Sequence, residues 1–198
     1  MIDTRIRARI DPVLNGIGSR LNRRGVRAGH ATAIGLLAGL AAALAAGLQH
    51  WWIALALWLA NRLVDGIDGP IARAGAPTPL GGYLDFVADY VVYVSIPVAI
   101  ALALPNTRLA ITVMLAAFLL NIVQLLTLSS IAEQQQRARA DGRALHFSHG
   151  LVEGAETIVA YALALALPSH AGTIFYAFAI MVLITAAQRF LDALRELA

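Results

Sequence analysis

The chain has 198 residues, of which 59% are hydrophobic and 14% charged, and its formal net charge is +3. Its mean hydropathy of +0.71, together with long uncharged runs, excludes an ordinary soluble protein and indicates one integral membrane domain over residues 1–198. No cysteine is present, which excludes disulfides and thiolate metal sites. Any metal chemistry must therefore use carboxylates.

The first segment, residues 1–27, carries seven arginines opposite a face of apolar residues at helical spacing. This pattern predicts an amphipathic helix that lies in the cytoplasmic membrane interface, and a solvated basic tail is the alternative. The segment has no uninterrupted apolar core, so we do not expect a cleavable signal peptide.

Apolar stretches fill most of residues 28–198 and predict an all-α bundle of six transmembrane helices. We expect these helices near residues 30–48, 51–73, 81–104, 108–132, 150–167 and 171–195. Arginines gather before the first helix, at Arg73 beside the 74–80 turn, in the 133–149 loop and at the C-terminal end, whereas the opposite loops hold only Arg108. The positive-inside rule therefore predicts a protein of the inner (cytoplasmic) membrane, with both termini on the cytoplasmic side.

Four aspartates interrupt the apolar pattern within residues 65–89, "DGIDGPIARAGAPTPLGGYLDFVAD". Asp65 and Asp68 are three residues apart near the cytoplasmic end of the second helix, and Asp85 and Asp89 are four apart at the start of the third. A short turn should fold the third helix back antiparallel to the second, so the four carboxylates should converge. Clustered carboxylates at membrane depth predict a site for Mg²⁺ or Mn²⁺, with room for two ions that share ligands.

An alternative is that the aspartates only pair with Arg62 and Arg73. Two arginines cannot neutralise four aspartates, which favours the metal site. Gly69 and Ala72, which follow Asp68 on the same helix, are small and leave room for a substrate phosphate. Arg73 offers this phosphate a countercharge.

Read from Asp65, the stretch has the form D-x2-D-G-x2-A-R-x7-G-x3-D-x3-D. This pattern resembles the signature of the CDP-alcohol phosphotransferase (CDP-alcohol phosphatidyltransferase) family, integral membrane enzymes of phospholipid synthesis. The similarity extends to the six spans, the interfacial helix and the stretch "GVRAGHAT" before the first span, where this chain has residues 28–30 in place of the Pro-Asn of many members.

The resemblance implies a metal-dependent attack by an alcohol on the β-phosphorus of CDP-diacylglycerol, with release of CMP. It implies that Asp65, Asp68 and Asp85 hold one divalent ion, and that Asp89 completes a two-ion site and accepts the proton of the attacking hydroxyl. The residues that it places around the CDP moiety are Asp65, Gly69, Ala72, Arg73, Thr78 and Gly81. It also implies a homodimer, membrane lipids as partners and no nucleic acid.

Two other readings stay open. A transporter for divalent cations or another solute could use the same carboxylates, although the chain has one carboxylate cluster and no second copy, whereas transporters often carry repeats. The second alternative is a homologue that has the fold but no activity, and the complete motif weighs against it.

The acceptor alcohol is the least determined feature. Phosphatidylglycerophosphate synthases, which use glycerol 3-phosphate, typically carry Gly-Lys-x-Lys-Thr at the start of the fifth helix, whereas this chain has "SHGLVEGAETIV" and no lysine anywhere. Glu153 and Glu156 would repel a phosphomonoester and suit hydroxyls or an amine. These glutamates could instead cap the helix or pair with Arg137, Arg139 or Arg143, which could themselves bind a phosphate, so glycerol 3-phosphate remains the alternative acceptor.

Overall fold

The computed structural model describes residues 14–138 and 154–197. Within these ranges all regular secondary structure is helical: a first helix over residues 14–23 is followed by longer helices and two short 3₁₀ turns. The elements are α2 (Ala28–Gly47), α3 (Trp51–Ala74), α4 (Pro79–Ala103), η1 (Pro105–Thr107), α5 (Arg108–Ala138), α6 (Gly154–Ala166), η2 (Pro168–His170) and α7 (Ala171–Leu197).

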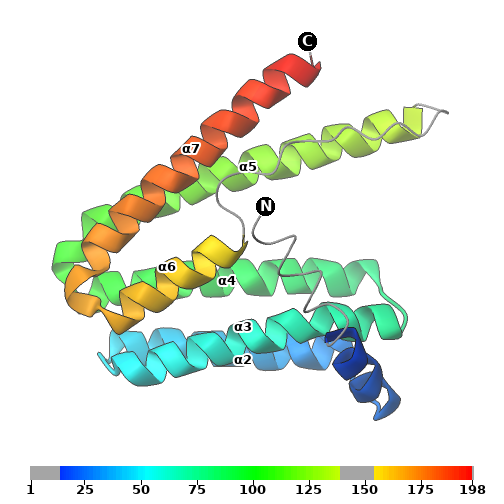
Figure 1. The fold of residues 1–198 in the computed structure, drawn as a ribbon, viewed down its shortest axis with the longest axis horizontal. Helices are drawn as coiled ribbons and strands as arrows, with labels where there is room; N and C mark the ends of the chain where they lie inside the picture. The colour runs from blue at the N-terminus through cyan, green and yellow to red at the C-terminus, as the bar shows by residue number, and fades with distance from the viewer. Residues whose placement is uncertain (1–13, 139–153, 198) are drawn as a thin grey trace.

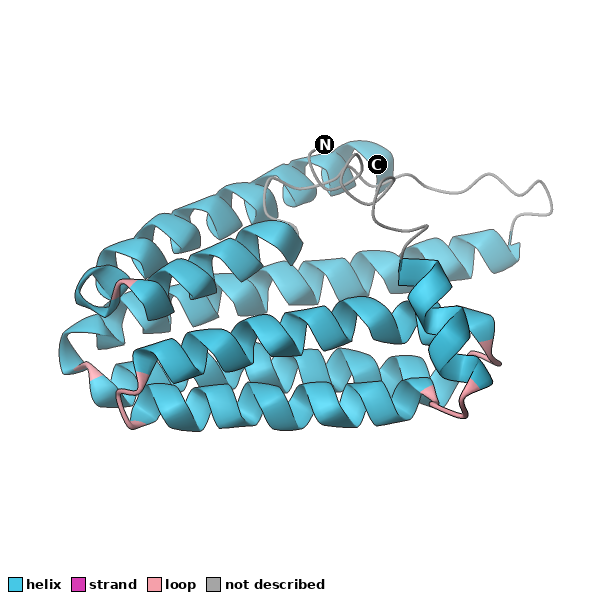
Figure 2. Ribbon diagram, turned by 60° about the horizontal axis from the view of Figure 1, so that its bottom comes forward, coloured by secondary structure: helices cyan, strands magenta, loops and turns pink. Residues whose placement is uncertain are grey.

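The helices form two groups (Figures 1 and 2). In one, α2 packs against both α3 and α4, and in the other α5 packs along α7. The short helix α6 lies between the groups and contacts α3 on one side and α7 on the other (Figure 1). A core of large side chains fills this junction, where Trp58, Ile96, Tyr161 and Phe175 are fully buried.

Local sequence explains where the helices begin and end. The hydroxyl of Thr78 accepts a hydrogen bond from the Gly81 N–H at 3.1 Å, and Pro79 occupies the first helical position, so α4 begins two residues before the predicted boundary. The helix α5 continues six residues past its predicted end because the run "EQQQRA" consists of good helix formers. The gap between the helices expected near 150–167 and 171–195 is the turn η2 (Pro168–His170).

Four helical segments have the length and composition of membrane spans: Ala28–Gly47, Pro79–Ala103, Pro105–Gln134 and Pro168–Arg195. Their leucines, among them Leu37, Leu102 and Leu109, are exposed on the outside of the protein, as lipid contact requires. It stays a prediction that α3 and α6 cross the membrane. The helix α3 carries four charged residues, Arg62, Asp65, Asp68 and Arg73, and α6 has only 13 residues. The same holds for an interfacial position of the helix over residues 14–23.

Two glycines let helices approach closely at points that position the aspartates. A Cβ on Gly39 of α2 would overlap the side chain of Val92 on α4. A Cβ on Gly18 would lie 2.6 Å from the carbonyl carbon of Pro70, so the first helix rests directly on the end of α3. Asn22 holds it there by donating to the Ala74 carbonyl at 2.9 Å.

We expect Gly39→Ala to lower the free energy of unfolding by about 1–3 kcal/mol, because the added methyl group overpacks the contact with Val92. Gly29→Ala on the same helix is the matched control, since nothing lies within 4 Å of its Cβ position. Thermal unfolding in detergent should show a lower Tm only for Gly39→Ala, partly restored by Val92→Ala in the same chain. Equal Tm values for both single variants would contradict this packing.

Candidate active site

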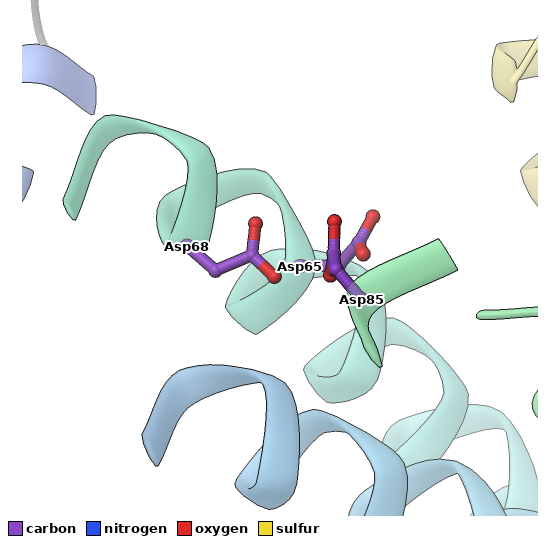
Figure 3. Close-up of side chains that lie close together, drawn as sticks. All are labelled: Asp65, Asp68 and Asp85. Atoms are coloured by element: carbon purple, nitrogen blue, oxygen red, sulfur yellow. The ribbon is translucent and has the colours of Figure 1, made fainter. Parts of the chain in front are cut away.

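Three of the four predicted aspartates form one cluster. Carboxylate oxygens of Asp65, Asp68 and Asp85 all lie within 4.8 Å of one another. Figure 3 shows the carboxylates gathered where the end of α3 faces the start of α4. Both helices pack on α2, which fixes their spacing, and their positions along the chain place the aspartates at the same level. Such a group of oxygens could hold a hard divalent cation.

Asp68 carries the clearest sign of an absent partner. This residue is 7% exposed, and its Oδ2 atom is buried without a hydrogen-bond partner. Buried polar atoms are normally satisfied, and an orphaned carboxylate oxygen is costly. A cation between Asp68 and Asp85 would satisfy it.

The fourth aspartate, Asp89, has a different partner. Arg62 on α3 donates from Nη2 to Asp89 Oδ1 at 2.8 Å, and its Nη1 lies 3.5 Å from Asp65 Oδ2. The alternative of simple ion pairing is therefore correct for Arg62, but Arg73 bonds to Asn15 Oδ1 at 3.1 Å. Asp68 and Asp85 have no ion-pair partner among the described residues that could explain their burial.

A cavity of about 680 Å³ opens beside the cluster, between the first turn of α2 and the α3–α4 connection. Asp68 and Asp85 line one end of it. Four of the residues predicted to border CDP line its wall, namely Gly69, Ala72, Thr78 and Gly81. A second cavity of about 10 Å³, room for roughly one water molecule, lies among all four aspartates.

Arg73 lies at the edge of the larger cavity rather than among its lining residues. Its side chain is exposed and passes over Gly69, because a Cβ on that glycine would lie 3.3 Å from Arg73 Nη1. Asn15 of the first helix holds the guanidinium in this position. The predicted countercharge is therefore close to the space where a phosphate would fit.

The predicted acceptor residues are only partly visible. Arg139, Arg143 and Glu153 lie outside the described residues, as does the side chain of Arg137 at the end of α5. Glu156 is half-buried in the first turn of α6. Two residues later, the Ile158 carbonyl accepts a hydrogen bond from Trp58 Nε1 at 3.3 Å, which joins this turn to the surroundings of Arg62.

Sequence reasoning missed part of this site. It named Arg62 only as an ion-pair partner and gave no role to Tyr93, whose hydroxyl accepts from Arg62 Nη1 at 2.7 Å. It also did not assign Asn22, Arg27 or His30, which line the larger cavity. A signal was present for Arg62, because an arginine three residues before an aspartate within an apolar helix needs a buried partner.

Comparison with known proteins identifies the family of the chain. Residues 30–193 match the family model for CDP-alcohol phosphatidyltransferase. The chain belongs to this family. It is 31% identical over 172 residues to the inner membrane protein YnjF of Escherichia coli K12. This aligned segment covers 85% of this chain and 84% of that protein. The family and the apolar helices together indicate an integral membrane protein.

Other similarities are more local or concern the fold alone. A phosphatidylcholine synthase of Rhizobium meliloti is 52% identical over 54 residues, which are 25% of this chain and 20% of that enzyme. Two crystal structures of Mycobacterium tuberculosis phosphatidylinositol phosphate synthase share the fold. One, with CDP-DAG bound, has a TM-score of 0.66 at 20% identity, covering 91% of this chain and 93% of that one. The other, with manganese and citrate, has a TM-score of 0.71 at 18% identity, covering 91% and 88%.

We expect Gly69→Val to raise the KM for a CDP-linked lipid at least tenfold, because the side chain would enter the larger cavity and displace Arg73. Gly66→Val is the matched control, because it lies one turn earlier on α3 with nothing within 4 Å of its Cβ position. Both variants carry the same change in helix propensity, so only the cavity separates them. Equal KM values in a CMP-release assay would contradict a nucleotide site beside Gly69.

Proposed function

We propose that this protein transfers the phosphatidyl group of CDP-diacylglycerol to an alcohol and releases CMP. The observation that carries the proposal is the orphaned, buried Asp68 carboxylate within a three-aspartate cluster that opens onto a cavity of about 680 Å³. Family membership supports the reaction class. The crystal structure of the related fold with CDP-DAG bound supports the choice of lipid substrate.

Asp65, Asp68 and Asp85 would hold Mg²⁺ or Mn²⁺, and their oxygen ligands suit such hard cations. The ion would neutralise the pyrophosphate of the substrate and polarise the bond that breaks. A second ion, which the sequence also predicts, would need Asp89, whose Oδ1 bonds to Arg62. Manganese in a crystal of the related synthase supports the type of metal.

The remaining residues bind and orient the substrate. Gly69, Ala72 and Gly81 have at most a methyl group where the nucleotide would lie, and Arg73, beside Gly69, would offer a countercharge to its phosphates. The acceptor oxygen forms a bond to the β-phosphorus as the bond from that phosphorus to the CMP oxygen breaks. Asp89 accepts the proton of the acceptor hydroxyl.

The cavity would face the cytoplasm, together with both termini, as the distribution of arginines predicts. In this orientation the nucleotide enters from water, and the acyl chains stay in lipid beside the exposed leucines of the helices. A homodimer is part of the proposal through the family resemblance alone.

Purified protein given CDP-diacylglycerol and an alcohol should release CMP only with a divalent cation. Asp68→Asn and Asp89→Asn should each reduce kcat at least a hundredfold, because one removes a metal ligand and the other the proton acceptor. Full activity after chelation, or near-normal turnover of either variant, would contradict the proposal. An absence of CMP with every acceptor offered would overturn it.

For the acceptor we propose an alcohol without a phosphomonoester, such as a polyol, an amino alcohol or a lipid headgroup. The chain has no lysine to bind a phosphomonoester. Glu156 lies in the first turn of α6, the helix that reaches the Arg62 region through the hydrogen bond between Trp58 and Ile158. The local identity to phosphatidylcholine synthases supports this class. Glycerol 3-phosphate is the alternative, supported by the arginines at the end of α5 and after it.

An acceptor screen with product mass measurement tests this assignment. We expect lipid products with choline, serine, inositol or phosphatidylglycerol to exceed those with glycerol 3-phosphate at equal concentration. Glu156→Gln should raise the KM for a cationic acceptor several-fold, whereas Glu156→Asp keeps the charge and should have a smaller effect. Efficient phosphatidylglycerophosphate formation at micromolar glycerol 3-phosphate, unaffected by Glu156→Gln, would contradict it.

A further inference from the structure

One face of the first helix rests on the end of α3. Asn15, Gly18 and Asn22 recur at intervals of three and four residues and therefore share this face. Gly18 is buried, and a Cβ on it would lie 2.6 Å from the carbonyl carbon of Pro70. Asn22 donates from Nδ2 to the Ala74 carbonyl at 2.9 Å. These two contacts with the backbone of α3 fix the first helix without help from Asn15.

Asn15 makes the remaining contact of this face, to the side chain of Arg73. Its Oδ1 atom accepts a hydrogen bond from Arg73 Nη2 at 3.1 Å. The other terminal nitrogen, Nη1, lies 3.3 Å from the Cβ position of Gly69, which lines the larger cavity. Among the described residues, Asn15 is the one acceptor that bonds to this guanidinium. One arm of the guanidinium is thus held by the first helix, and the other lies beside the space where a phosphate would fit.

The neutral amide of Asn15 distinguishes this contact from an ion pair. An amide oxygen orients the guanidinium of Arg73 and leaves its positive charge uncompensated. By contrast, Arg62 on the same helix is paired with two carboxylates, those of Asp89 and Asp65. Both Asn15 and Arg73 are exposed, so without this bond the guanidinium would sample many rotamers, and a substrate would have to order it on binding.

We propose that Asn15 is a positioning residue that presents the charged Arg73 guanidinium to the pyrophosphate of the CDP-linked substrate. The position requires a neutral acceptor, because a carboxylate there would pair with Arg73 and compete with the phosphates. A contact that served only to dock the first helix would have the opposite requirement, since a carboxylate would bond to Arg73 more strongly. This inference rests on the proposed function, because it takes the larger cavity to be the nucleotide site.

CMP release by the full-length protein in detergent, with CDP-diacylglycerol, Mn²⁺ and the acceptor of highest turnover, tests this requirement. We expect Asn15→Asp to raise the KM for the lipid about tenfold and to change kcat less than about twofold, because the charge that binds phosphate is neutralised. Asn15→Ala keeps the charge but frees the side chain, so its KM should rise only about threefold. The Tm of Asn15→Asp should be unchanged or higher, because an ion pair replaces the hydrogen bond.

Two controls separate this effect from a general effect of added charge. Gly16→Asp adds the same charge one residue along the helix, where nothing lies within 4 Å of the Cβ position, and should change KM less than about twofold. In a chain that already carries Arg73→Gln, adding Asn15→Asp should also change KM less than about twofold, because the two side chains act as a pair.

A wild-type KM for Asn15→Asp would overturn the inference, as would an equal rise in Gly16→Asp or a rise that persists beside Arg73→Gln. A lower Tm together with the higher KM would assign the effect to lost docking and overturn it too. Calorimetric titration with CDP and Mn²⁺ separates this failure from that of the proposed function. If no acceptor yields CMP, that function fails, and weaker CDP binding by Asn15→Asp alone would still support the inference. No binding of CDP by the wild-type chain would refute both.

Discussion

The ion pair between Arg62 and Asp89 is the constraint on which the arrangement of this site depends. A guanidinium inside an apolar bundle is stable only if carboxylate, hydroxyl and amide acceptors surround it, because water cannot reach it. Here the acceptors come from α3 and α4. Asn61 of α3 donates to a carbonyl of α2, and Tyr161 of α6 donates to the Tyr93 carbonyl, so both acceptors are held in place. The same side chain therefore stabilises the junction of four helices and neutralises charge on Asp89 and Asp65.

Small residues make the rest of the site. Gly39 brings α4 against α2, and Gly18 brings the first helix onto Pro70, so the aspartates and Arg73 are held by close backbone contacts. Around Gly69 and Gly81 the absence of side chains instead leaves the larger cavity open. Glycine thus allows tight helix packing at some positions of the site and leaves a cavity open at others.

Much of this could be predicted from the sequence. The ends of five of the six expected helices lie within about four residues of the prediction, because uncharged runs and prolines mark them directly. The spacing of Asp65, Asp68 and Asp85 predicted their shared cluster, since i,i+3 spacing and a short turn bring them together. All four aspartates line one small cavity, as their spacing predicted, but the short ion pair of Asp89 with Arg62 could not be predicted, because it depends on Tyr93 and Trp58 holding one rotamer of Arg62. Asn15 and Asn22 were missed for a similar reason, since their partners lie more than 50 residues away.

The central claim is that a divalent cation bound by the aspartate cluster contacts the phosphates of CDP-diacylglycerol in the neighbouring cavity. Anomalous diffraction from crystals of the protein grown with Mn²⁺ and CDP-diacylglycerol would test it most directly. We expect a manganese peak bonded to Asp65, Asp68 and Asp85 and to the pyrophosphate, with the cytidine in the cavity lined by Gly69 and Thr78. A nucleotide bound elsewhere, or a cluster without manganese while the lipid is bound, would contradict it.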